Sequence, residues 1–367
     1  MKNKKSNRRP GTTADVENGL GDERMVLDTI KGPEDVKRLS EEERKELAAE
    51  IREFLIETTS RTGGHLASNL GVVELTIAMF CALNLPKDKI IWDVGHQSYT
   101  HKILSGRKDN FDGLRQYGGL SGFPKRKESP FDAFDTGHSS TSISAGLGMA
   151  QGRDLLGEDY SIVSVIGDGA LTGGMAYEAL SNAGTSGEPL LVVLNDNNMS
   201  IGKNVGGLSK YLNEIRLGNA YNELKTGVES SLMGSKTGKK IAKVLKRSKD
   251  NIKQFFVPGM FFEELGITYV GPIDGHDINQ MITTFQHAFR LDKPIIIHVK
   301  TKKGKGYKFA EQDKVGKWHG VSPFDVVTGK SLCLLPPNEI SWSQVISNTV
   351  MDLAEKDKSI VAITPAM

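Results

Sequence analysis

Two short polar clusters, Gly167-Asp168-Gly169 and Asn195-Asp196-Asn197, combine residue types that could hold a metal ion and a phosphate group. Each cluster follows an apolar run of strand length, and a helix-like segment separates the two. A carboxylate, an amide oxygen and a backbone carbonyl such as that of Met199 are hard oxygen ligands, which suit Mg²⁺. Gly169 and Ala170 leave room for a diphosphate beside backbone N–H groups at the start of the helix.

A Gly-Asp-Gly sequence by itself is most often a tight turn, so Asp168 alone would not indicate a metal site. The second cluster makes the pattern more specific, because parallel strands bring their carboxyl ends to one edge of a sheet, where ligands bind at a switch point. The helix-containing connection has the length that a parallel pair requires. We therefore expect Asp168 and Asn197 to lie at one site.

The bulk composition excludes several classes of protein. The 367 residues are 38% apolar, and 47 basic and 45 acidic residues give a formal net charge of +2, which favours neither nucleic acid nor a membrane surface as partner. The two cysteines, Cys81 and Cys333, have no disulfide or zinc spacing, which is typical of a reducing cytoplasm. No apolar run approaches the roughly 18 residues of a membrane span. A small molecule or another protein is the expected partner.

Alternating strands and helices over residues 25–331 predict an α/β fold, with a doubly wound, mostly parallel sheet and helices on both faces. Ser40 and Glu43 have the capping-box spacing and predict a helix that continues to about Thr59. The other expected elements are helices at Gly71 to Leu83, Ser142 to Leu156 and Ile278 to Arg290, and strands at Ile90 to Asp93, Ile267 to Val270 and Pro294 to Thr301.

Four further segments differ from this pattern. Residues 1–24 have the composition of a disordered tail; a nucleic-acid arm is the sharper alternative, and the acidic residues disfavour a transit peptide. Residues 203–253 predict a mobile insertion over the surface. After a linker at 332–340, residues 341–367 predict one helix (Ser341 to Ala354) and one strand (Ser359 to Thr364). Two elements cannot bury a core, so we expect the truncated start of a second α/β domain.

The two polar clusters resemble the metal and diphosphate motif of thiamine diphosphate enzymes. Further segments resemble the 1-deoxy-D-xylulose-5-phosphate synthase family within that group. They are Gly63-Gly64-His65, Trp92-Asp93-Val94-Gly95-His96-Gln97, the run from Gly137-His138-Ser139 to Gly146, Gly271-Pro272-Ile273-Asp274-Gly275-His276-Asp277 and Lys303-Gly304-Lys305-Gly306-Tyr307. The resemblance runs from about residue 25 to the end of the chain. It implies a thiamine diphosphate-binding fold with thiamine diphosphate and Mg²⁺ as cofactors.

The resemblance also implies roles for individual residues. Asp168, Asn197 and the Met199 carbonyl would bind Mg²⁺. His65 and His96 would face the reacting carbon, where a histidine could hydrogen-bond a carbonyl or move a proton. The residues implied to contact the cofactor are His96, Gly137, His138, Ser139, Gly169, Ala170, Asn197 and Tyr307.

Other interpretations of these residues stay open. His65 could be an ordinary loop or cap residue after two glycines, and Tyr307 a surface residue on a basic loop. His138 and Ser139 could form a nucleophilic pair, but the chain lacks a G-x-S-x-G turn at this position. No catalytic role is assigned to His276 or to His319.

The implied reaction is decarboxylation of pyruvate and transfer of the two-carbon unit to D-glyceraldehyde 3-phosphate, which serves isoprenoid, thiamine and pyridoxal synthesis. In this family a second domain supplies the glutamate that activates the cofactor, and no residue of 1–367 can be given that role. We therefore expect this chain to supply the diphosphate and magnesium half of the site and to be inactive alone. A homodimer or a partner chain would supply the other half. Alternatives are a non-catalytic cofactor-binding or scaffold module, and the N-terminal subunit of a split transketolase-like enzyme.

Overall fold

The computed structural model describes residues 25–197, 206–213, 215, 259–333, 336 and 339–363. The predictions for the N-terminal tail, for most of the insertion at 203–253 and for Met199 fall outside these residues. Within the described ranges, no helix combines the length and the apolar character that crossing a membrane requires.

Five parallel strands form one sheet in the order β1-β2-β3-β5-β4. The register places Gly167 opposite Asn195, so the two polar clusters of the sequence meet at the same edge of the sheet. The predicted α/β fold is thereby confirmed. The strands are β1 (Lys89–Trp92), β2 (Ile162–Gly167), β3 (Leu191–Asp196), β4 (Thr268–Asp274) and β5 (Ile295–Lys300).

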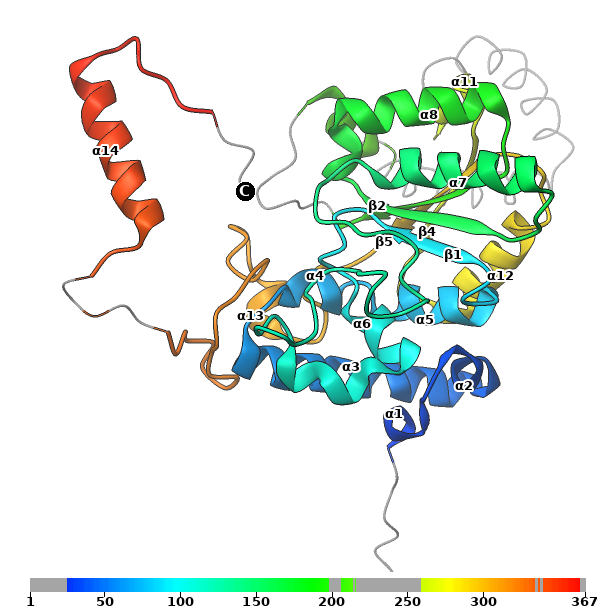
Figure 1. Cartoon of the computed structure of the whole chain (residues 1–367), viewed down its shortest axis with the longest axis horizontal. Helices are drawn as coiled ribbons and strands as arrows, with labels where there is room; N and C mark the ends of the chain where they lie inside the picture. The colour runs from blue at the N-terminus through cyan, green and yellow to red at the C-terminus, as the bar shows by residue number, and fades with distance from the viewer. Residues whose placement is uncertain are drawn as a thin grey trace, which may run out of the picture.

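Helices cover both faces of this sheet (Figure 1). On one face lie α7 (Ser142–Leu156), α8 (Gly174–Ser186) and α11 (Met260–Glu264), and on the other lie α3 (Glu41–Thr62), α5 (Val73–Ala82) and α12 (Ile278–Ala288). The shorter helical segments are α1 (Val26–Thr29), α2 (Pro33–Arg38), α4 (Leu66–Leu70), α6 (Tyr99–Lys102), η1 (Ile103–Arg107), η2 (Lys108–Gly113), η3 (Ala170–Thr172) and α13 (Lys308–Glu311).

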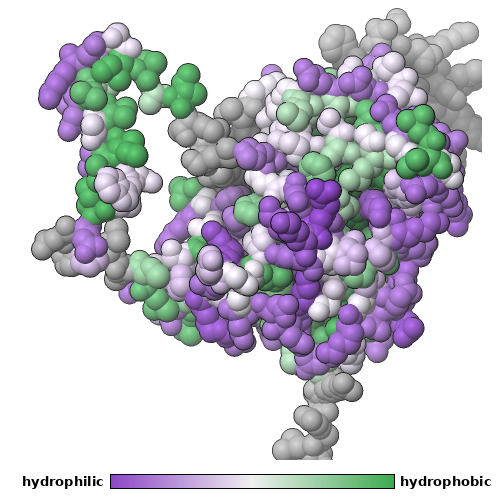
Figure 2. Space-filling model, in the orientation of Figure 1, coloured by the Kyte–Doolittle hydropathy of each residue, from purple (hydrophilic) through white to green (hydrophobic). Residues whose placement is uncertain are grey.

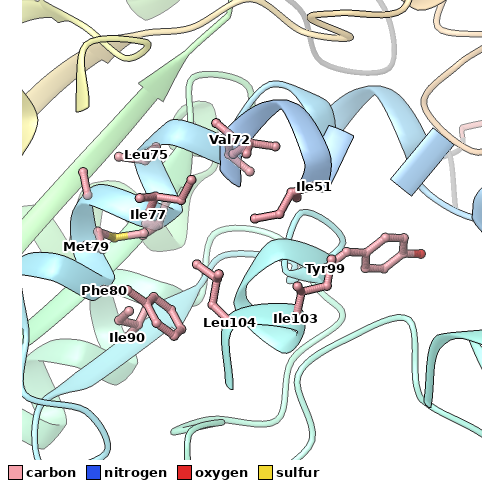
Figure 3. Packing of buried hydrophobic residues seen from close by; sticks show 14 of the residues in the cluster. Ile51, Val72, Leu75, Ile77, Met79, Phe80, Ile90, Tyr99, Ile103 and Leu104 are labelled. Atoms are coloured by element: carbon pink, nitrogen blue, oxygen red, sulfur yellow. The ribbon is translucent and has the colours of Figure 1, made fainter. Parts of the chain in front are cut away.

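Alternate strand residues feed two apolar cores. In β1, Ile90 and Trp92 belong to the core under α3, α5 and α12, whereas Ile91 belongs to the core under α7 and α8. Figure 3 shows Phe80 of α5 beside Ile90 in the first of these cores. Burial on both faces explains why the strands are continuously apolar until their polar carboxyl ends.

The helix starts follow the predicted capping chemistry. The Ser40 hydroxyl accepts the Glu43 N–H at 3.2 Å, and the Glu43 carboxylate accepts the Ser40 N–H at 2.6 Å, which is a complete capping box at the start of α3. Helix α7 has the predicted bounds and ends at Gly157, whose φ of 65° provides the left-handed C-cap.

The last described segment consists of α14 (Trp342–Lys356) and the residues that follow it. The predicted helix is confirmed. The predicted strand is wrong for its described part, Ser359 to Ile363. A strand needs a neighbouring strand to which its backbone can hydrogen-bond, and none of the described strands pairs with this segment. No residue of α14 is buried, and Figure 2 shows apolar side chains along it, with Trp342 83% exposed. The start of a second domain here stays a prediction.

Candidate active site

A cavity of about 1300 Å³ lies beyond the carboxyl ends of β1, β2 and β3. This cavity is lined by eight of the residues that the sequence predicts to bind the cofactor or its metal. They come from the ends of three strands and from the loop before α7: His96, Gly137, His138, Ser139, Asp168, Gly169, Ala170 and Asn197. His65 is not part of the lining, but its ring centroid lies 5.5 Å from that of His96. The structure therefore gathers nearly all of the predicted site residues that it describes.

The edge of the sheet that is predicted to bind the metal lies where β2 and β3 end. The Asp168 N–H donates to the Asn195 carbonyl at 3.2 Å, which joins the two polar clusters through the backbone. The Asn195 side-chain oxygen accepts the Thr301 hydroxyl at 2.6 Å, so this asparagine is fixed from β5. Asp168, only 4% exposed, and Asn197 both face the cavity and bring a carboxylate and an amide oxygen to one edge of the sheet.

Glycines leave open space on this side of the cavity. An added Cβ at Gly137 or at Gly167 would meet no atom within 4 Å, although both residues line the cavity. No group of three His, Cys, Asp or Glu side chains capable of holding a metal occurs among the described residues. This arrangement fits Mg²⁺ that takes few protein ligands and completes its shell with phosphate and water oxygens, and it fits a diphosphate lying against backbone.

The loop that carries Gly137, His138 and Ser139 is anchored by Asp93, a residue to which the sequence analysis assigned no role. The Asp93 carboxylate, 1% exposed, accepts the N–H groups of Ser140 at 2.7 Å and Ser142 at 3.0 Å. Burial raises the pKa of Asp93, although these N–H groups act in the opposite direction. The one signal in the sequence was an acidic residue directly after a buried strand.

Ser140 connects this loop to the next one. Its hydroxyl donates to the Ala170 carbonyl at 2.8 Å, and its φ of 69° lies in the left-handed region that a non-glycine residue rarely adopts. An added Cβ at Gly173 would lie 2.3 Å from the Ser140 hydroxyl oxygen. The loop before α7 and the loop after β2 are therefore packed directly on each other.

The backbone also reverses sharply just before His96. Val94, a β-branched residue, has a φ of 60°, and Gly95 follows with a φ of 87°. Left-handed backbone at a β-branched residue costs about 1–3 kcal/mol and persists only where the surroundings impose it. An added Cβ at Gly95 would lie 2.5 Å from Pro124 and 2.6 Å from Thr136. This reversal directs the His96 segment along the cavity wall.

Three histidine rings lie together: His96 and His319, which line the cavity, and His65 beside them. The ring of His319 lies 4.8 Å from that of His96 and 5.9 Å from that of His65, centroid to centroid. Burial lowers the pKa of His65 to about 4, with contributions from Arg115 and His319, and burial lowers the pKa of His96 well below its usual value. Burial and the Lys303 charge lower the pKa of His319 to about 4. All three rings are therefore neutral at pH 7.

Sequence reasoning missed His319 and Lys303 as site residues. Both line the cavity, and the Lys303 ammonium lies 3.4 Å from Nδ1 of His319. Burial lowers the pKa of Lys303, whereas Asp313 and Asp168 act in the opposite direction. The glycine-containing basic motif after β5 was a signal for Lys303, but His319 lies in a loop without any strand-end or motif signature.

Tyr307 lies apart from the other expected cofactor residues. It does not line the cavity; it is 7% exposed, and its hydroxyl donates to the Val326 carbonyl at 2.9 Å. Its ring packs on Trp318 and Phe324, with centroid separations of 5.1 and 5.9 Å. Tyr307 therefore packs within the segment that carries His319 and is not the surface residue considered from the sequence, and its contact with the cofactor stays a prediction. No hydrogen bond joins the described side chains of His138 and Ser139, so the nucleophilic alternative gains no support.

The fold is that of transketolase-like α/β proteins. It is similar to transketolase from Leishmania mexicana, with a TM-score of 0.55 and 17% identity over 86% of this chain and 45% of that one. It is also similar to transketolase from Campylobacter jejuni, with a TM-score of 0.52 and 20% identity over 74% of this chain and 40% of that one. At these identities the likeness concerns the fold.

Sequence comparison identifies the family. The family description of 1-deoxy-D-xylulose-5-phosphate synthase matches residues 27–301, and the chain belongs to this family of transketolase-like transferases, which use thiamine diphosphate and Mg²⁺. The synthase of Lachnoclostridium phytofermentans is 54% identical over 93% of this chain and 54% of its own length. The synthase of Clostridium beijerinckii is 55% identical over 93% of this chain and 55% of its own length. The chain thus spans about half the length of these relatives.

Proposed function

We propose that this chain supplies the diphosphate- and magnesium-binding half of a 1-deoxy-D-xylulose-5-phosphate synthase site. The reaction condenses pyruvate, with decarboxylation, and D-glyceraldehyde 3-phosphate to 1-deoxy-D-xylulose 5-phosphate. The observation that carries this proposal is that Asp168, Asn197 and the open glycine-lined backbone border one cavity at the strand ends. Family membership supports the choice of substrates.

The cavity residues divide into two groups by chemistry. Asp168 and Asn197, with the Met199 carbonyl, would bind Mg²⁺, and the backbone of Gly137 to Ser139 and of Gly169 and Ala170 would contact the diphosphate. The Lys303 cation adds positive charge near the same anion. Thiamine diphosphate, when bound, supplies the carbanion chemistry, and the protein supplies binding and orientation.

The histidines form the second group. Because His65, His96 and His319 are neutral at pH 7, each can donate one hydrogen bond and accept another without bringing charge to the cavity. Nδ1 of His96 is buried and has no hydrogen-bond partner among the residues that the structure describes. We assign to His65 and His96 the binding of a substrate carbonyl or hydroxyl and the movement of a proton to or from it.

A second chain would complete the site. None of the described residues that line the cavity is a glutamate, and the carboxylate of Asp93 is engaged by two backbone N–H groups. The apolar residues of α14 are exposed, as expected of a surface that a partner covers. We therefore propose that the isolated chain is inactive and that a homodimer or partner chain adds the missing groups. Separately, we propose that the protein works in the cytoplasm.

Thermal denaturation with thiamine diphosphate and MgCl₂, together and separately, tests the cofactor proposal. Binding at a ligand concentration of 100 Kd would stabilise the chain by about 2.7 kcal/mol, and we expect this only when both are present. No stabilisation would refute cofactor binding by this chain. Product formation from pyruvate and D-glyceraldehyde 3-phosphate is then measured with the chain alone and with the second half of a relative. Activity only in the mixture supports the proposal; binding without activity in either favours the non-catalytic module.

A further inference from the structure

We infer that Asn69 is a positioning residue that holds His65 and His96 in one fixed arrangement. This inference rests on the proposed function only in treating the two histidines as groups that face the substrate. The arrangement itself stands on the contacts of a single buried amide.

Asn69 lies in α4 and is 0% exposed. Its Nδ2 donates to the His65 carbonyl at 2.6 Å and to the His96 carbonyl at 2.8 Å. Its Oδ1 accepts the backbone N–H of Tyr99 at 2.7 Å. Both amide hydrogens and the amide oxygen are therefore used, which fixes the orientation of the side chain.

The two carbonyls belong to different parts of the chain. His65 follows α3 and the turn at Gly63 and Gly64, whereas His96 follows β1 and the backbone reversal at Gly95. One nitrogen atom bridges them, so the separation of the two histidine backbones is set by the geometry of the Asn69 amide. The rings then meet edge to face, with centroids 5.5 Å apart.

Hydrogen bonds to the ring nitrogens contribute little to the positions of the two histidine rings. Within the described part of the chain, Nδ1 of His96 has no hydrogen-bond partner, so the backbone and the surrounding packing determine the position of this ring. His65 has one additional partner, the Tyr99 hydroxyl. This hydroxyl accepts the backbone N–H of His65 at 3.2 Å and lies 3.4 Å from Nδ1 of the His65 ring. Asn69 therefore acts on both histidines, and the Tyr99 hydroxyl contacts His65.

This difference allows a matched test by NMR of the chain without cofactor. Histidine ring signals are assigned with His65→Gln and His96→Gln. Asn69→Asp keeps the acceptor for the Tyr99 N–H but loses both donors, and Asn69→Ser is a second variant with a shorter side chain. Tyr99→Phe removes the hydroxyl alone. Thr76→Val is the control, since it removes a buried hydrogen bond of 2.7 Å from the Thr76 hydroxyl to the Val72 carbonyl, and this hydroxyl makes no hydrogen bond to His65 or His96.

We expect the Asn69 variants to move the ring signals of both His65 and His96, Tyr99→Phe to move that of His65, and Thr76→Val to move neither. A folded Asn69 variant with both signals unchanged would overturn the inference. If neither Asn69 variant folds, Tyr99→Phe decides: a shift of the His96 signal as large as that of His65 would show that the Tyr99 hydroxyl positions His96 as well, and it would overturn the inference. Because the signals need no cofactor, failure of thiamine diphosphate to stabilise the wild-type chain would be a separate result.

Discussion

Asp93 and Ser140 are 47 residues apart in the chain, yet the buried Asp93 carboxylate accepts the Ser140 N–H at 2.7 Å. The same carboxylate binds the Ser142 N–H, and the Ser140 hydroxyl reaches the Ala170 carbonyl. One side chain at the end of β1 thus holds the loop of Gly137 to Ser139 against the loop after β2. The backbone expected to receive a diphosphate is therefore held in place by hydrogen bonds within the protein.

Replacing Asp93 by alanine should therefore weaken both the fold and cofactor binding. Two buried N–H groups would lose their acceptor, and each such loss costs about 1–3 kcal/mol, so we expect a decrease of about 2–6 kcal/mol in the free energy of unfolding. Asp93→Asn keeps one acceptor oxygen and should lose less. Urea denaturation of the two variants checks this, and an alanine variant as stable as the wild type would contradict it.

Asp168→Ala or Asn197→Ala should abolish magnesium-dependent binding of thiamine diphosphate and leave the fold largely intact, since each removes one oxygen ligand at the surface of the cavity. Calorimetric titration with the cofactor in MgCl₂ measures the loss. Asp135→Ala is a suitable control, because Asp135 also lines the cavity but accepts the Arg126 N–H at 2.7 Å. Retained binding in either test variant would count against the metal assignment.

The buried histidines predict a particular dependence on pH. The pKa of His65 and that of His319 are both lowered to about 4, chiefly by burial, so their NMR titration midpoints should lie near 4 and not near the usual 6.5. Protonation then favours the unfolded chain, so their contribution to stability is complete above pH 6.5 and is lost as the pH falls through about 4. Midpoints near 6.5 in the folded chain would refute this prediction.

Glu74 predicts a second, more acidic transition. Burial by itself would raise its pKa, but the hydrogen bond from His276 at 3.1 Å and the Arg52 ion pair lower it to about 2. The resulting stabilisation, about 3 kcal/mol, is present above pH 4.5 and is lost as the pH falls toward 2. Denaturation between pH 5 and 2 should show a flatter dependence in Glu74→Gln than in the wild type. Parallel curves would show that Glu74 does not contribute.

Gly95→Ala tests the backbone reversal before His96. At a φ of 87°, with an added Cβ 2.5 Å from Pro124, alanine should cost about 2 kcal/mol or more. Gly152→Ala is the matched control, because Gly152 lies within α7 and an added Cβ meets nothing within 4 Å; it should add about 0.5–1 kcal/mol. Thermal unfolding distinguishes the two, and equal effects would argue against strain at Gly95.

Prediction from the sequence succeeded where local pattern carries the information. The bounds of α7 and the capping box at Ser40 follow from residue types that act within one or two turns of the chain. The strand predicted at Ser359 failed for the opposite reason, since a strand exists only by pairing with a neighbour. The loop that carries His319 has no helical or strand periodicity, and His319 meets His96 across more than 200 residues of chain, so its place at the cavity could not be predicted from its sequence neighbours.

What the sequence by itself determined was the alternation of apolar strands and helices, and with it the meeting of Asp168 and Asn197 at one edge, because parallel strands all end on the same side of a sheet. Tertiary structure alone decided the contents of the rest of the cavity. In the folded chain the ring of His319 lies beside that of His96, and the ring of Tyr307 packs on Trp318. Asn69 lies between the carbonyls of His65 and His96. The physical reason is that contacts between distant loops depend on how the packed elements lie in space, which no local pattern records.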